Sequence, residues 1–242
     1  MIDLSSLNGF LRVETFKMET PETIRASLHQ GEWVTSIDLT DAYLHVPIHP
    51  RDQKFLRFEH RGDVFQFSSL PFGLATAPSV FTRLAKEVKL MALAKGIRIH
   101  VYLDDWLIRA DSPEEAARSS QEVVALVSSL GWMINYKKSE LIPTQTFNFV
   151  GYQYDLSRAL VRPTQDRWSK LQSVISSANS HNVIAVRKLM SLLGLLASTE
   201  KMVPLRRLHM RLLQWHLKRH WHVPMSLNRS ISWTNQAKKA AS

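Results

Sequence analysis

Two adjacent aspartates interrupt the most strand-like segment of this 242-residue chain. Asp104 and Asp105 stand inside "IRIHVYLDDWLIRA", where apolar and polar residues alternate from Ile97 with the period of two that a half-buried strand requires. Neighbouring carboxylates repel each other and are poor strand residues. The pair therefore indicates a solvated turn, a surface feature without a role, or a site that binds a cation.

A third carboxylate, Asp38, ends the apolar run "WVTSIDL", which we expect to be a strand. A predicted helix separates this strand from the hairpin that carries Asp104 and Asp105. In an antiparallel sheet with helices packed behind it, the end of the first strand would lie beside the tip of the hairpin. Clustered carboxylates need a cation, and oxygen ligands without nearby His or Cys favour Mg²⁺ or Mn²⁺. Two such ions are the usual arrangement for in-line phosphoryl transfer on nucleic acids.

Turn and cap residues divide the first 160 residues into short strands and two long helices. The strand that ends near Leu39 should be followed by a turn and extended chain to Pro50, and then by a hairpin around "HRGD". Helices are expected over residues 77–96 and 112–131, with a further hairpin in "FNFVGYQYDLSRALVR". The first helix is supported by Pro78, Gly96 and the apolar face Phe81, Leu84, Val88 and Met91, and the second by the cap residues Ser112, Pro113, Glu115 and Gly131.

Beyond about residue 160 the chain becomes helical and basic. The segment "PLRRLHMRLLQWHLKRH" is amphipathic, with one apolar stripe and basic residues beside it. The stripe consists of Leu205, Leu208, Leu212 and Trp215, and the basic residues off it are Arg207, Arg211 and Lys218. These basic residues indicate either an ordinary solvated face or contacts with a nucleic-acid backbone.

Composition narrows the class of protein. The net charge is +10 at pH 7 and the pI is about 10.0, which favours a polyanionic partner, with nucleic acid first. Cysteine is absent, which excludes disulfides, thiolate zinc sites and a cysteine nucleophile. The sequence shows neither an apolar run of membrane-spanning length nor a signal-peptide pattern. We expect a soluble, intracellular protein without a membrane partner.

Four stretches together resemble the reverse transcriptases of retroelements: "SIDLTDAYLHVPIHP", "LPFGLATAPSVFTRL", "YLDD" and "LGWMINYKKSELIPTQTFNFVGYQY". They occur in the order and at the spacing of that family. "MIDLSSLNGFL" and "SLLGLLASTEKMVPLRRLHMRLLQ" make the resemblance closest to DIRS-like retrotransposons, with gypsy-like elements next. The resemblance implies an α+β right-hand polymerase fold. Residues 1–160 would form partial fingers and an antiparallel palm sheet with helices behind it, and residues 161–242 a helical, basic thumb or connection segment.

The resemblance also assigns roles to residues of the polymerase site. It implies an RNA-directed DNA polymerase that uses two Mg²⁺ or Mn²⁺ ions to add dNTPs to a primer on an RNA or DNA template. Asp38 and Asp104 would bind the ions, and Asp105 would bind them or shape the site. Tyr43 would be the steric gate against ribose. Near the nucleotide, the resemblance implies Phe72, Gly73 and either Lys137 or Lys138. At the primer it implies Phe149, Val150, Gly151 and Tyr152. Along the duplex it implies Arg207, Arg211 and Lys218.

The sequence departs from the family at its start. A basic fingers segment that supplies an Arg and a Lys to the triphosphate should precede "MIDLSSLN", so we expect a chain truncated in the fingers, with other polyprotein domains beyond it. The alternative is an inactive nucleic-acid-binding relic of a reverse transcriptase. A viral-type RNA polymerase fits Tyr43 and "YLDD" poorly, and a purely structural interaction protein does not explain the four ordered motifs.

Overall fold

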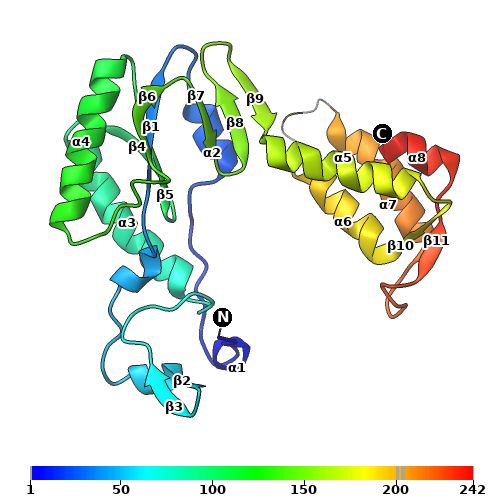
Figure 1. Ribbon diagram of the computed structural model, residues 1–242, viewed down its shortest axis with the longest axis horizontal. Coiled ribbons are helices and arrows are strands. Elements are labelled where there is room, and N and C mark those ends of the chain that lie inside the picture. Colours follow the sequence, from blue (N-terminus) through cyan, green and yellow to red (C-terminus); the bar gives the residue numbers. More distant parts are fainter. Residues whose placement is uncertain (1, 200–201, 203–204, 242) are drawn as a thin grey trace. The chain divides into compact units, whose positions relative to one another are not determined.

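The structure, a computed structural model, describes residues 2–199, 202 and 205–241. The chain forms two compact units, Met1–Val150 with Tyr154–Leu160, and Gly151–Gln153 with Val161–Ser242 (Figure 1). The first unit contains a four-stranded antiparallel sheet in the order β4-β5-β1-β6. Its strands are β1 (Trp33–Asp38), β4 (Arg98–Tyr102), β5 (Asp105–Ala110) and β6 (Glu140–Thr144).

One face of this sheet is covered by α3 (Ala77–Ala94) and α4 (Pro113–Ser129). Side chains alternate between the two faces of a strand, and Ile37, Trp106 and Ile108 belong to the core that these helices share with the sheet. Ile37 pairs with Trp106 and the next pair is Asp38 with Asp105. The carboxylates therefore project from the face that α3 and α4 do not cover.

The two helices begin and end largely where their cap residues predict. Pro78 lies in the first turn of α3, and Gly96 follows its end with a φ of +80°. The apolar face was predicted partly wrongly, because Leu84 and Met91 are 43% and 48% exposed. Ala85 and Ala92 are buried in their place, since small side chains let the helix approach the sheet closely. On α4, the Ser112 hydroxyl accepts a hydrogen bond from the Glu115 N–H (3.2 Å), but the Glu115 carboxylate accepts one from Asp111 N–H (3.2 Å) instead of Ser112 N–H.

The segment between β1 and the first hairpin differs from its prediction. Extended chain was expected to Pro50, but a 3₁₀ helix, η1 (Ala42–His45), follows Asp41, whose φ is +47°. A second 3₁₀ helix, η2 (Gln53–Leu56), leads into the predicted hairpin of β2 (Arg57–His60) and β3 (Asp63–Gln66). The hairpin turn has positive φ at Arg61 and Gly62, as a two-residue turn of this kind needs.

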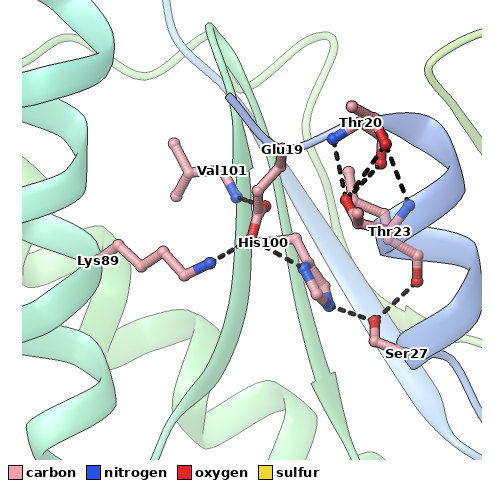
Figure 2. Close-up of polar contacts among 8 residues, drawn as sticks. Glu19, Thr20, Thr23, Ser27, Lys89, His100 and Val101 are labelled. Carbon is pink, nitrogen blue, oxygen red and sulfur yellow. Dashed lines mark hydrogen bonds and ion pairs between the residues drawn. The ribbon is translucent and has the colours of Figure 1, made fainter. Parts of the chain in front are cut away.

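Two N-terminal helices, α1 (Ser5–Asn8) and α2 (Pro21–Ser27), flank an extended segment that reaches the outer edge of β4. Figure 2 shows Glu19 from this segment between α3 and β4. The Glu19 carboxylate accepts hydrogen bonds from Lys89 Nζ, from His100 Nδ1 (3.3 Å) and from the Val101 N–H (2.8 Å). A side chain thus satisfies a backbone group that an edge strand would leave unpaired.

A three-stranded sheet of β7 (Thr146–Phe149), β8 (Tyr152–Asp155) and β9 (Leu160–Pro163) follows β6. The predicted hairpin over "FNFVGYQYDLSRALVR" thus gains a third strand. The boundary between the two compact units falls within this sheet and again at Leu160.

The second unit has its own core. Its elements are α5 (Gln165–Asn179), β10 (Val183–Ala185), α6 (Val186–Ala197), α7 (Arg206–His220), β11 (Ser230–Ser232) and α8 (Asn235–Ala241). The predicted apolar stripe of α7 is not its buried face: Leu208 and Trp215 are 65% and 63% exposed, whereas Met210 and Leu213 pack in the core with α6. Within the described part of the chain, no helix is both long and apolar enough to cross a membrane.

Candidate active site

The structure brings the three aspartates of the sequence prediction together at one end of the four-stranded sheet. Asp38, the last residue of β1, is the cross-strand partner of Asp105, the first residue of β5. Asp104 lies in the turn before β5, where its carbonyl accepts the Leu39 N–H (3.0 Å). Residues more than sixty positions apart thus meet through the pairing of β1 with β5, as the order of strands and helices predicted.

The turn that carries Asp104 is held in a conformation that a leucine rarely adopts. Leu103 has a φ of +53°. The fully buried Trp106 donates a hydrogen bond from its indole Nε1 to the Leu103 carbonyl (2.9 Å). This contact links the turn to the core beneath the sheet and fixes the backbone from which the Asp104 side chain projects.

The electrostatics of the three carboxylates are unfavourable without a cation. Burial raises the pKa of Asp105 to about 6, with further increases from the negative charges of Asp104 and Asp38. Burial and Asp104 also raise the pKa of Asp38, whereas the Lys138 ammonium opposes the increase. A single lysine near three acids leaves a net negative charge that another cation could neutralise.

A short segment after α4 holds Asp38 in place, and the sequence prediction missed most of it. The Asp38 N–H donates to the Ser139 hydroxyl (3.0 Å), which itself donates to the Asn135 carbonyl (2.8 Å). The Asn135 N–H donates to the Asp38 carbonyl (2.8 Å), and the Asn135 side chain hydrogen-bonds the Asp38 carboxylate. Of the two candidate lysines, Lys138 is the one whose charge acts on Asp38 and Asp105. Asn and Ser near a lysine are too common in loops to reveal this role from sequence.

Tyr43 lies beside the carboxylates. Burial raises its pKa, with a further increase from the nearby charge of Asp104. Its ring centroid is 5.0 Å from that of Phe72 and 5.6 Å from that of Phe81. Phe72 itself is 51% exposed. Tyr43 therefore lies next to Phe72 and near the charge of Asp104.

The loop that contains Phe72 and Gly73 is fastened by a residue that the sequence prediction did not single out. The Asn8 side-chain amide donates to the Gly73 carbonyl (2.9 Å) and accepts the Ala75 N–H (2.8 Å). Gly73 has a φ of +91°, which disfavours any residue with a side chain. Asn8 thus couples α1 to the loop.

The remaining predicted contact residues lie elsewhere in the fold. In "FVGY", Val150 and Gly151 form the turn between β7 and β8 with positive φ, while Phe149 is buried. The Arg167 guanidinium lies over the Tyr152 ring, 5.3 Å from its centroid. Arg207, Arg211 and Lys218 are all exposed on α7. Lys137 is exposed next to Lys138.

The donor set suits a hard divalent cation. Carboxylate oxygens are the ligands that Mg²⁺ and Mn²⁺ prefer. Across residues 2–199, 202 and 205–241, no three His, Cys, Asp or Glu side chains form a ready-made metal-binding group. Mg²⁺ commonly binds one or two carboxylates and takes its other ligands from water or substrate phosphates.

Sequence comparison decides the family. Residues 4–154, more than half of the chain, match the profile described as Reverse transcriptase (RNA-dependent DNA polymerase). The chain belongs to the reverse transcriptase family. This reverse transcriptase is 28% identical over 157 residues to Protein P of duck hepatitis B virus (strain China), a match that covers 63% of this chain and 19% of that protein. It is 25% identical over 171 residues to the Transposon Tf2-3 polyprotein of Schizosaccharomyces pombe, covering 71% of this chain and 12% of the polyprotein.

Solved structures confirm the predicted fold class. The foamy viral protease-reverse transcriptase dRH in complex with double-stranded DNA matches with a TM-score of 0.83 and 20% identity, covering 99% of this chain and 39% of that one. The foamy viral protease-reverse transcriptase in complex with an RNA/DNA hybrid matches with a TM-score of 0.80 and 21% identity, covering 100% of this chain and 30% of that one. The chain thus has the right-hand polymerase fold, and it spans less than half the length of the proteins that it matches.

Proposed function

We propose that this chain is the polymerase part of a retroelement RNA-directed DNA polymerase. The observation that carries the proposal is the meeting of Asp38, Asp104 and Asp105 at one end of the sheet, in a chain of this family. The reaction transfers a nucleotide from a dNTP to a primer 3′-hydroxyl on an RNA or DNA template. Residues 1–160 then correspond to partial fingers and palm, and residues 161–242 to the thumb or connection segment. The site of action is intracellular, where template and dNTPs are found.

Asp38 and Asp104 would hold two Mg²⁺ ions, with Asp105 as an additional ligand or a residue that shapes the site. Bound ions would activate the primer hydroxyl and neutralise the charge that develops on the phosphates. Lys138 lies near enough to the carboxylates for its charge to oppose the rise in the pKa of Asp38, so it is the better candidate of the two lysines for the triphosphate. Asn135 and Ser139 would position Asp38 through the hydrogen bonds described above.

The aromatic pair beside the carboxylates would select the nucleotide. Tyr43, which packs against Phe72 near the Asp104 charge, would meet the 2′ position of an incoming sugar, and Phe72 and Gly73 would line the same pocket. Phe149 is buried, so contacts of "FVGY" with a primer would come from the backbone of Val150 and Gly151 and from Tyr152. The exposed Arg207, Arg211 and Lys218 would contact the duplex backbone.

The motifs favour a DIRS-like element over a gypsy-like one, within a longer polyprotein. The alternative is a relic that binds nucleic acid without extending a primer. The intact arrangement of all three aspartates favours the enzyme, since a relic is under no need to keep a cluster with unfavourable electrostatics.

Primer extension on a poly(rA)–oligo(dT) substrate tests the proposal. Asp38→Asn and Asp104→Asn should each reduce Mg²⁺-dependent extension by about a thousandfold or more, because each removes a charged ligand. Asp166→Asn, the same change at an exposed position on α5, should leave extension unchanged. Circular dichroism should show that all three variants fold. Template–primer binding without extension in Mg²⁺ or Mn²⁺ would support the relic, and normal extension by Asp104→Asn would refute the metal site.

A further inference from the structure

A cavity of about 420 Å³ lies outside the candidate active site, between α3, β4, the Thr23 region of α2 and the extended segment that carries Glu19. Its volume is within the range of small-molecule sites. Met18, Leu90, Leu93 and Val101 form an apolar part of its wall. Leu90 and Leu93 are 46% and 43% exposed, although both lie on a helix that packs against the sheet. The wall therefore offers apolar area that a ligand could bury.

One polar group in the lining of this cavity lacks a hydrogen-bond partner. The hydroxyl of Thr82, on α3, is buried and makes no hydrogen bond with any residue that the structure describes. A buried hydroxyl without a partner is unfavourable, and most such groups in folded proteins are paired. The hydroxyl oxygen itself is covered by neighbouring atoms, so the Thr82 side chain would have to rotate before it could donate a hydrogen bond to an acceptor that enters the cavity.

The charges around the cavity indicate which acceptor would fit. Lys17, Lys86 and Lys89 line it together with a single acid, Glu19. The Glu19 carboxylate already accepts from Lys89, His100 and the Val101 N–H, so it is fully engaged by its neighbours (Figure 2). Lys17 and Lys86 have no carboxylate partner within the described residues. An anionic head group would therefore find two ammonium groups without a carboxylate partner in the lining of the cavity that also contains Thr82.

We propose that this cavity binds a small amphipathic anion, with an apolar body against Leu90, Leu93 and Val101 and its anionic head at Thr82, Lys86 and Lys17. The site is separate from the proposed polymerase chemistry and does not depend on it. It combines the three features that a small-molecule site needs: an apolar wall, a few convergent polar groups and a concave shape.

Decanoate is a suitable probe, and decyltrimethylammonium, which has the same chain and the opposite charge, is its control. Isothermal titration calorimetry with the full chain, below the micelle concentration, should show at least about tenfold tighter binding of decanoate. Decanoate should also shift the amide signals of Thr82 and Val101 in NMR spectra. Equal affinity for the two amphiphiles would refute the proposal, because it would indicate a simple apolar patch.

Three variants locate the head group. Thr82→Val keeps the shape of the side chain, so it should weaken decanoate binding about tenfold or more without lowering the stability of the free protein. Lys86→Gln changes an exposed residue and should weaken binding a few-fold, in a salt-dependent way. Lys95→Gln, the same change beyond the end of the same helix and outside the cavity, should have no effect. Unchanged decanoate affinity in both Thr82→Val and Lys86→Gln would overturn the assignment.

Discussion

At the scale of single residues, Tyr43 gives the sharpest test of substrate choice. Its ring packs against Phe72 and Phe81 and lies close enough to Asp104 for that charge to raise its pKa. Replacing Tyr43 with Ala removes the ring that would collide with a 2′-hydroxyl, the group that distinguishes ribose from deoxyribose. The efficiency of rNTP relative to dNTP incorporation should rise by at least about tenfold, equivalent to roughly 1.4 kcal/mol of discrimination. Phe72→Ala is the control, because it should lower both efficiencies without changing their ratio. An unchanged ratio in an active Tyr43→Ala protein would make Tyr43 an ordinary packing residue.

At the scale of elements, Glu19 anchors the N-terminal segment to α3 and β4. Burial alone would raise its pKa, but the hydrogen bonds and charges of His100 and Lys89 lower that pKa to about 2. A carboxylate whose pKa is lower in the folded state stabilises the fold above its unfolded pKa, and this contribution disappears as the pH falls from about 4.5 towards 2. Glu19→Gln should therefore cost roughly 1–3 kcal/mol near pH 6, and the difference from wild type should shrink below pH 4.5. Urea unfolding at several pH values measures this difference.

Glu14→Gln removes an exposed ion pair with Arg83 and should cost less than about 1 kcal/mol. A Glu19→Gln cost that does not vary with pH would contradict the role of the carboxylate charge.

At the scale of the whole molecule, the net charge of +10 predicts binding to nucleic acid, but it does not say where. We expect part of the interface with the duplex to lie on α7. Replacing Arg207, Arg211 and Lys218 together with Gln should weaken template–primer binding and reduce the slope of log affinity against log salt by about 0.9 for each phosphate that is no longer neutralised. Replacing Lys95, Arg118 and Lys170, which lie on α3, α4 and α5 or just beyond, makes the same change in net charge. Equal weakening in the two triple variants would mean that the charge acts as a whole and that α7 has no special role.

Much of the polymerase core could be predicted because the residues that cap its helices and the alternation of apolar residues in its strands indicate the same elements. Proline and glycine mark the ends of α3, and the alternation around Asp104 and Asp105 marks a hairpin. The short strand β6 was missed because it contains Pro143, which a sheet accepts only where a backbone N–H is not needed, and β6 is an edge strand. The extended chain expected around Tyr43 was wrong because the left-handed conformation of Asp41 starts a 3₁₀ helix that no single residue type specifies.

The predicted buried face of α7 was wrong for a different reason. Leu208, Leu212 and Trp215 have the spacing of a buried face, but Met210 and Leu213 fill the core instead. Periodicity identifies an apolar face without saying which neighbour covers it, and a helix with two apolar faces leaves that choice to tertiary packing. The sequence did not predict the roles of Asn135, Ser139 and Asn8. These roles depend largely on hydrogen bonds with backbone atoms that are distant in sequence.

The placement of β1 in the middle of its sheet has a consequence for the order of folding. Both neighbours of β1, namely β5 and β6, come from sequence more than sixty residues after its end, as the pairing of Asp38 with Asp105 shows. During synthesis, the apolar strand with Val34 and Ile37 leaves the ribosome well before either neighbour exists. Such non-local pairing is slow, and an unpaired apolar strand is prone to aggregate. The hairpin of β4 and β5 is local and can form first, so β1 would join a template that already carries Asp104 and Asp105. The carboxylate cluster is then assembled only in the step that closes the sheet.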